Sequence, residues 1–190
     1  MLSADLTRRE LTFAARDSVT GHCGKVFVET TLAAHEVVSV TACHELFEMV
    51  IDPIANLWAL ADDGTEYAYE MCDPVEEDTF VVDGIEMSNF VHPSWFEPFK
   101  HPPGTKFDHL GRLSKPFSMT KGGYVITMKS GKVKEVFGSK AKERRFKQED
   151  RTGHRSEYRK PEKQAQLIKA VAPRLAERNM AALLKELPAV

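Results

Sequence analysis

The sequence predicts an α+β fold, and three observations support that class. Short apolar runs bounded by turn residues indicate strands, an apolar stretch over 38–51 indicates a helix, and Asp83-Gly84 between two apolar runs indicates a hairpin. The chain has 190 residues, of which 42% are hydrophobic, and this suits one domain with its own core.

The expected elements follow one another in a simple order. Strands are predicted at 11–15, 25–29, 67–71, 79–82, 85–87 and 123–128, with a turn at 121–123 before the last one. Asp83-Gly84 favours a two-residue turn because glycine adopts positive φ without steric cost. Four prolines exclude regular structure over 91–104, so an ordered loop is expected there, held by Trp95, Phe96 and Phe99.

The helix over 38–51 is expected to begin at a polar N-cap, either Ser39 or Thr41. Its end is set by Pro53, because proline restricts the conformation of the residue before it. Its apolar positions are Leu46, Phe47, Val50 and Ile51.

Charge is distributed unevenly along the chain. Fifteen Asp and Glu residues and no Lys or Arg lie between residues 35 and 99, whereas residues 129–163 carry a net charge of +7. Carboxylates at such density repel one another unless a cation is bound or folded against them. We therefore expect partners or ions at both stretches; two solvated surfaces of opposite sign are the alternative.

Three parts are predicted along the chain: a folded domain over 1–128, a basic extended arm over 129–163 and an amphipathic C-terminal helix over 164–187. The arm has too few apolar residues to offset the entropy of ordering it, so we expect it to become ordered only against a partner.

Other features make several protein classes improbable. No apolar run approaches the roughly 20 residues that a transmembrane helix needs, and the first residues lack the apolar region of a secretory signal. Three cysteines, with no Cys-x-x-Cys pair, argue against a disulfide framework. Synthesis in the cytoplasm and no membrane partner are expected.

A candidate metal motif lies within the predicted helix. His44, Glu48 and Asp52 are four residues apart, and on a helix they fall within an arc of roughly 80°. His44 and Glu48 match the His-Glu-x-x-His pattern of zinc peptidases with the second His replaced by Glu. In that chemistry both are metal ligands, and Glu45 is the general base that activates a metal-bound water. A polar stripe facing solvent is the alternative interpretation.

Further ligands are available downstream. Glu70 and Asp73 could add oxygen ligands, which completes a predicted divalent metal site of His44, Glu48, Asp52, Glu70 and Asp73. One imidazole with several carboxylates favours calcium, magnesium or manganese nearly as much as zinc.

Three blocks of sequence resemble a family of small, mostly uncharacterised tailed-bacteriophage proteins. They are TACHELFEMVIDP at 41–53, EMCDPVE at 70–76 and GIEMSNFVHPSWF at 84–96, and the resemblance covers roughly residues 35–128. That family has a zincin-like His-Glu-x-x-Glu helix followed by Asp-Pro. The resemblance implies a zincin-like core, with a small sheet packed on this helix, and a virion protein made in the host cytoplasm.

Two functions stay open at this point. In the first, the chain is a virion structural or assembly protein that binds a metal, and its arm binds other virion proteins or copies of itself. In the second, it is a metal-dependent hydrolase of the peptidase type with Glu45 as general base. Nucleic acid is a less favoured partner of the arm, because among its charges only Phe146 and Tyr158 are available for base stacking.

Overall fold

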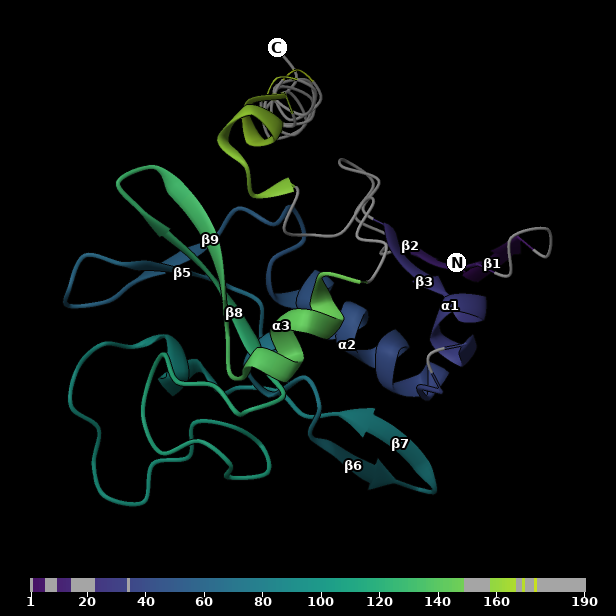
Figure 1. Cartoon of the computed structure of the whole chain (residues 1–190), viewed down its shortest axis with the longest axis horizontal. Helices are drawn as coiled ribbons and strands as arrows, with labels where there is room; N and C mark the ends of the chain where they lie inside the picture. Colours follow the sequence, from purple (N-terminus) through teal and green to yellow (C-terminus); the bar gives the residue numbers. More distant parts are fainter. Residues whose placement is uncertain are drawn as a thin grey trace, which may run out of the picture.

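The computed structural model describes residues 2–5, 10–14, 23–33, 35–148, 158–166, 169 and 173 (Figure 1). Its strands form three antiparallel sheets. The first has the order β1 (Leu2–Asp5), β2 (Glu10–Ala14), β3 (Cys23–Phe27), and the second has the order β4 (Trp58–Leu60), β5 (Glu66–Ala68), β8 (Tyr124–Lys129), β9 (Lys132–Phe137). The third is the hairpin β6 (Thr79–Val82) and β7 (Ile85–Ser88), which turns at Asp83-Gly84 as predicted.

Helices complete the fold and confirm its α+β class. They are α1 (Val28–Ala33), α2 (Val38–Ile51), α3 (Lys140–Phe146) and the 3-10 turns η1 (Asp73–Val75) and η2 (Pro93–Phe96). The predicted strand at 25–29 therefore ends early, because residues 28 and 29 begin α1. In the view of Figure 1 the first sheet and the four-stranded sheet lie on opposite sides of α2.

Helix α2 has the predicted bounds but not the predicted cap. Its N-cap is Val37, which makes no side-chain cap bond, and the Ser39 hydroxyl instead donates to the Glu86 carbonyl of β7 at 2.7 Å. One turn later the Ser88 N–H donates to the Cys43 sulfur at 2.9 Å. These bonds help to hold α2 against β7, and α2 also packs on β3.

Two apolar clusters lie on opposite faces of β8, whose side chains alternate between them. Val125 joins the first cluster, which packs under the loop 91–120 and includes the buried Trp95 and Phe96. Tyr124 and Ile126 join the second cluster. Phe99, predicted to hold the loop, is 59% exposed; the loop is held by the buried Asp108 carboxylate, which accepts hydrogen bonds from the Asn89 side chain and the amides of Arg112 and Leu113.

The prediction of an extended arm over 129–163 is wrong for its first half. Residues 132–137 pair with β8 as β9, and residues 140–146 form α3. The few apolar side chains of this stretch are concentrated in the second cluster, where Phe146 is buried and Val133 and Phe137 pack against it. That shared burial offsets the entropy of ordering a segment otherwise rich in charge.

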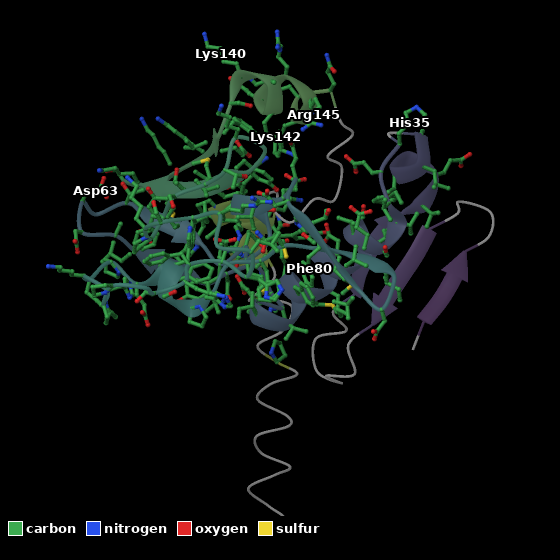
Figure 2. The ribbon with its side chains drawn as sticks, turned by 90° about the horizontal axis from the view of Figure 1, so that it is seen from below. His35, Asp63, Phe80, Lys140, Lys142 and Arg145 are labelled. Carbon is green, nitrogen blue, oxygen red and sulfur yellow. The ribbon has the colours of Figure 1, made fainter. Side chains whose placement is uncertain are left out.

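Cations of this stretch also meet the acidic stretch directly. Lys142 of α3 is buried and pairs with Glu76 at 2.5 Å, and Arg145 pairs with Glu77. Lys142 and Arg145 are labelled in Figure 2, together with Lys140, which is exposed. The predicted boundary at residue 128 therefore cuts through the β8–β9 hairpin.

The rest of the basic and C-terminal segments is described only in part. Residues 149–157 lie outside the described residues, and residues 161–166 are helical. Of the predicted helix over 164–187, the structure describes 164–166, 169 and 173, so most of that prediction lies outside it. Within the described part of the chain, we find no helix with the length and apolar character needed to span a membrane.

Candidate metal centre

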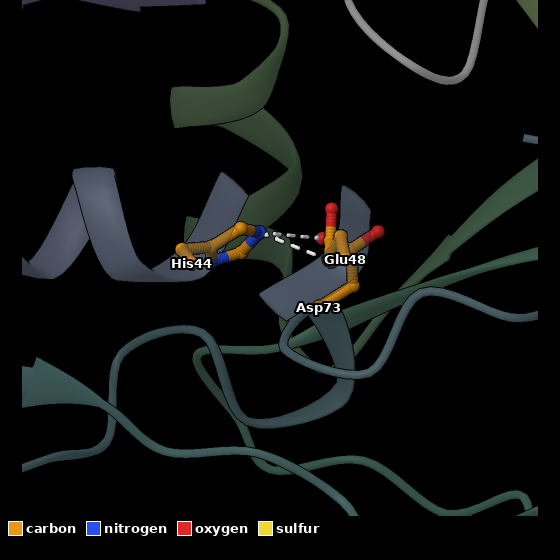
Figure 3. Close-up of side chains that lie close together, drawn as sticks. All are labelled: His44, Glu48 and Asp73. Atoms are coloured by element: carbon orange, nitrogen blue, oxygen red, sulfur yellow. Dashed lines mark hydrogen bonds and ion pairs between the residues drawn. The ribbon is translucent and has the colours of Figure 1, made fainter. Parts of the chain in front are cut away.

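The structure brings together three of the predicted ligands. Helix α2 presents His44 and Glu48 one turn apart, and η1 presents Asp73 beside them (Figure 3). His44 Nε2 lies 3.2 Å from Glu48 Oε1 and 3.2 Å from Asp73 Oδ1. One ligand atom from each residue lies within 4.8 Å of the other two. Ligands at the zinc distances of about 2.0–2.1 Å, arranged tetrahedrally, stand about 3.3 Å apart, so this spacing fits a metal ion.

Asp73 reaches the helix because η1 packs closely against the start of β8. A Cβ on Gly123 would lie 2.1 Å from the Pro74 carbonyl oxygen, so only glycine fits at that approach. The Thr120 N–H donates to the same oxygen at 2.9 Å. Two residues distant in sequence, Thr120 and Gly123, thus help to fix the backbone that carries Asp73.

All three side chains are buried, and this sets their protonation. Burial alone lowers the pKa of His44, but the neighbouring Glu48 carboxylate and the hydrogen bond with Asp73 outweigh it and raise that pKa well above 6.5. Burial, and then repulsion from Asp73, raise the pKa of Glu48 well above 4.5. The triad therefore holds protons tightly when no metal replaces them.

The other two predicted ligands bind a cation of the protein itself. Asp52 and Glu70 are fully buried, and the Arg159 guanidinium lies between them: Nη2 donates to Asp52 Oδ2 at 2.7 Å and Nε to Glu70 Oε1 at 2.5 Å. The prediction that these two carboxylates join the metal triad is therefore not met in this arrangement. Sequence reasoning missed Arg159 because it is one of thirteen Lys and Arg residues in the basic stretch, and no local pattern distinguishes it.

Glu45, the predicted general base, follows His44 on α2 and is only partly buried. It is outside the group of His44, Glu48 and Asp73 whose ligand atoms converge. Consecutive helical residues point about 100° apart, which accounts for this separation. Its catalytic role stays a prediction.

Among the buried ionisable side chains in and around the triad, acidic groups outnumber basic ones. Four carboxylates, those of Glu48, Asp52, Glu70 and Asp73, share the Arg159 guanidinium and the His44 imidazole. With every carboxylate ionised and His44 protonated, the formal charges of these six residues are four negative and two positive. One imidazole and two carboxylates are ligands that zinc and calcium both accept, so the donor set does not select one of them.

Comparisons of the chain with protein-family models, with curated proteins and with solved structures find no significant match.

Proposed function

We propose that the chain is a structural protein whose buried triad of His44, Glu48 and Asp73 binds a divalent metal ion. The observation that carries this proposal is the convergence of three ligand atoms within 4.8 Å at residues that solvent hardly reaches. A metal there ties helix α2 to η1, and its ligands His44 and Asp73 are 29 residues apart in sequence. Three protein ligands leave one tetrahedral position open, as in catalytic zinc sites, so the structural role is supported by the burial of the site and not by the number of its ligands.

The biological role that we propose for this metal-binding protein rests on the sequence resemblance to tailed-bacteriophage proteins. In line with it, we propose a zincin-like core in a virion or assembly protein, with other virion proteins and copies of itself as partners. The placing of His44 and Glu48 on one helix, with an acidic residue supplied from outside it, supports a metallopeptidase-like ligand set.

Metal content provides the direct test. Elemental mass spectrometry of purified protein is expected to find close to one zinc or calcium ion per chain, and the His44→Ala/Glu48→Ala variant is expected to lose it. Asp62→Ala is the matched control, because Asp62 is an exposed carboxylate outside the triad. Protein that binds neither ion, and whose melting temperature does not respond to a chelator, would contradict the proposal.

The hydrolase alternative is separated from the structural role by Glu45→Gln. A structural ion is indifferent to this change, so metal content and melting temperature are expected to stay as in the wild type. Wild-type protein is expected to be inactive on a denatured protein substrate. Activity that Glu45→Gln abolishes at unchanged metal content would instead establish the metal-dependent hydrolase.

A further inference from the structure

The β6–β7 hairpin ends in an exposed apolar surface, which we call the hairpin tip (residues 82–85). Val82 and Ile85 are opposite each other in the two strands and are 48% and 54% exposed. Opposite residues of an antiparallel pair share one face, so these two side chains adjoin. The turn between them holds Asp83, an exposed carboxylate with no ion pair within the described part of the chain. The tip thus presents apolar side chains beside a negative charge.

The hairpin is held firmly at its base and turns tightly at its tip. The bonds of β7 to α2 described above fix one strand, and the Asn89 N–H donates to the Asp78 carbonyl at 2.8 Å where the strands end. Asp83 and Gly84 have φ of +49° and +82°, as a two-residue hairpin turn requires. An element fixed in this way loses little conformational entropy when it binds a partner.

A cavity of about 350 Å³ lies in the loop 91–120, and we call it the loop cavity. Phe99, Phe107 and three prolines give it largely apolar walls. Lys100 and Lys115 also line it, whereas no Asp or Glu does. Both lysines are exposed, and neither has an ion-pair partner among the residues that the structure describes. The volume is at the lower end of the range for ligand pockets, so the loop cavity has room for a few side chains.

The loop around the cavity is attached to η2 at two places. The Ser94 hydroxyl donates to the Lys106 carbonyl at 2.6 Å, and the Phe117 N–H donates to the Trp95 carbonyl at 3.2 Å. Phe117 has a φ of +53°, which residues other than glycine rarely adopt and which persists only where the surroundings fix it. The shape of the loop cavity is therefore set by contacts within the chain and needs no ligand.

The hairpin tip and the loop cavity are complementary, but they lie apart in one copy of the chain. The tip offers a carboxylate and apolar side chains, and the cavity offers two ammonium groups and apolar walls, so charge and polarity both match. In Figure 1 the loop 91–120 lies to the left of the β6–β7 hairpin, whose tip points to the right. A chain therefore does not reach its own cavity with its own tip, whereas a second copy can.

We propose that the hairpin tip of one copy of the chain docks into the loop cavity of another copy, with Asp83 between Lys100 and Lys115. The proposal rests on the self-association in the proposed function, for which it names the contact, and it needs no metal at the triad. Tip and cavity are different surfaces, so the contact is head-to-tail and each copy can bind two others.

Two variants with opposite defects test the contact. The tip variant, Val82→Thr/Asp83→Asn/Ile85→Thr, keeps residues that suit strands and a turn residue that tolerates positive φ. The cavity variant, Lys100→Glu/Lys115→Glu, changes only exposed residues. In sedimentation velocity the wild type is expected to associate as its concentration rises, and each variant alone is expected to stay monomeric. An equimolar mixture is expected to form one-to-one complexes, because the intact tip of one variant fits the intact cavity of the other.

The matched controls are Asp62→Asn for the tip variant and Lys132→Glu/Lys134→Glu for the cavity variant. These residues are exposed and belong to neither surface, so both controls are expected to associate as the wild type does. Association of the tip or cavity variant at the wild-type level would overturn the docking contact and leave self-association in place. Absence of a complex in their mixture would overturn it as well.

Carbodiimide cross-linking provides a second measurement that also detects weak contacts. In a mixture of isotope-labelled and unlabelled wild type, it is expected to join Asp83 of one copy to Lys100 or Lys115 of another. Absence of this cross-link between copies would overturn the contact. Metal content is measured on the same samples: a wild type that stays monomeric with its metal bound would overturn the contact and self-association, and would leave the metal proposal standing.

Discussion

His44 faces two of the buried carboxylates of this protein, and Arg159 faces two others. Glu48 and Asp73 face the imidazole, whereas Asp52 and Glu70 face the guanidinium. The two groups adjoin, since Asp52, the C-cap of α2, comes four residues after Glu48, and Glu70 contributes to the raised pKa of Glu48. Two of these four carboxylates thus pair with the permanent cation Arg159, and the other two can bind a proton or a metal ion.

Proton binding at the triad predicts how stability changes with pH. The pKa values of His44 and Glu48 are raised in the folded state, so the folded protein keeps protons that the unfolded chain releases above 6.5 and 4.5. Their contribution is complete below those values and is lost as pH rises through the folded-state pKa values. The melting temperature of chelator-treated protein is therefore expected to fall as the pH rises above the ordinary histidine pKa of 6.5.

Added zinc or calcium is expected to restore stability above this pH and to do little near pH 5, where protons compete for the ligands. His44→Gln should flatten the pH dependence. His35→Asn is the control, because His35 is exposed and has a positive φ that asparagine tolerates. An equal slope in His44→Gln and the wild type would show that the triad does not cause it.

Among the elements, η1 connects the metal centre to the sheet. One side of it presents Asp73 to α2, and its Pro74 carbonyl touches β8 through Gly123. Its neighbour Glu76 binds Lys142 of α3. The position of the ligand Asp73 therefore depends on how η1 packs against β8 and α3.

Gly123→Ala tests this connection. The added Cβ would collide with the Pro74 carbonyl and push η1 away from β8, so the free energy of unfolding is expected to fall by about 1–3 kcal/mol. Metal affinity is expected to fall as well, because Asp73 moves with η1. Chemical denaturation and metal titration measure the two effects.

Gly131→Ala serves as the matched control for Gly123→Ala. Gly131 has a φ of +74° in the β8–β9 turn, and a Cβ there meets no neighbouring atom, so alanine is strained without displacing η1. It is expected to reduce stability while metal affinity stays unchanged. Wild-type metal affinity in Gly123→Ala would show that the packing of η1 against β8 does not determine metal binding.

For the whole molecule, the acidic and basic stretches of the sequence fold against each other. Lys129, Lys142, Arg145 and Arg159 from the basic stretch pair with carboxylates of the acidic one, namely Asp63, Glu76, Glu77, Asp52 and Glu70. The cation that the acidic stretch needs is therefore supplied in part by the same chain. The pairs of Lys142 and Arg159 are buried, so breaking one of them costs more stability than breaking an exposed pair, which contributes little to stability.

This arrangement predicts where the chain can be shortened. A chain of residues 1–148 keeps β9 and α3 and is expected to unfold cooperatively. A chain of residues 1–129 loses Val133, Phe137 and Phe146 from the second cluster and leaves the edge of β8 uncovered, so it is expected to lose cooperative unfolding.

Calorimetry of both chains measures the difference. The longer chain also lacks Arg159, so it should carry Asp52→Asn/Glu70→Gln, and the shorter one the same changes, to avoid two uncompensated buried charges. A melting temperature of the 1–129 chain within about 5 °C of the longer one would show that the body folds without β9 and α3.

Local signals in the sequence were sufficient for several elements. Pro53 predicted the end of α2, whereas its start was predicted from a Ser39 or Thr41 cap and the N-cap is Val37. Asp83-Gly84 predicted the β6–β7 turn, where both residues have positive φ. The spacing of His44 and Glu48 predicted that they share a helix face, and Asp73 was predicted beside them. β9 and α3 were missed because their stretch has few apolar residues, and these become buried only in the cluster that Ala68, Tyr124 and Ile126 also form.

The sequence by itself determined the class of the fold, the helix that carries the site and the residue types that could bind a metal, because each follows from contacts between neighbours along the chain. Only the tertiary structure decided which carboxylates face His44 and which face Arg159. That division depends on contacts such as those of Arg159 with Asp52 and Glu70, which are 107 and 89 residues away from it. No local period records such contacts, since they arise from how buried charges are neutralised once the chain has folded.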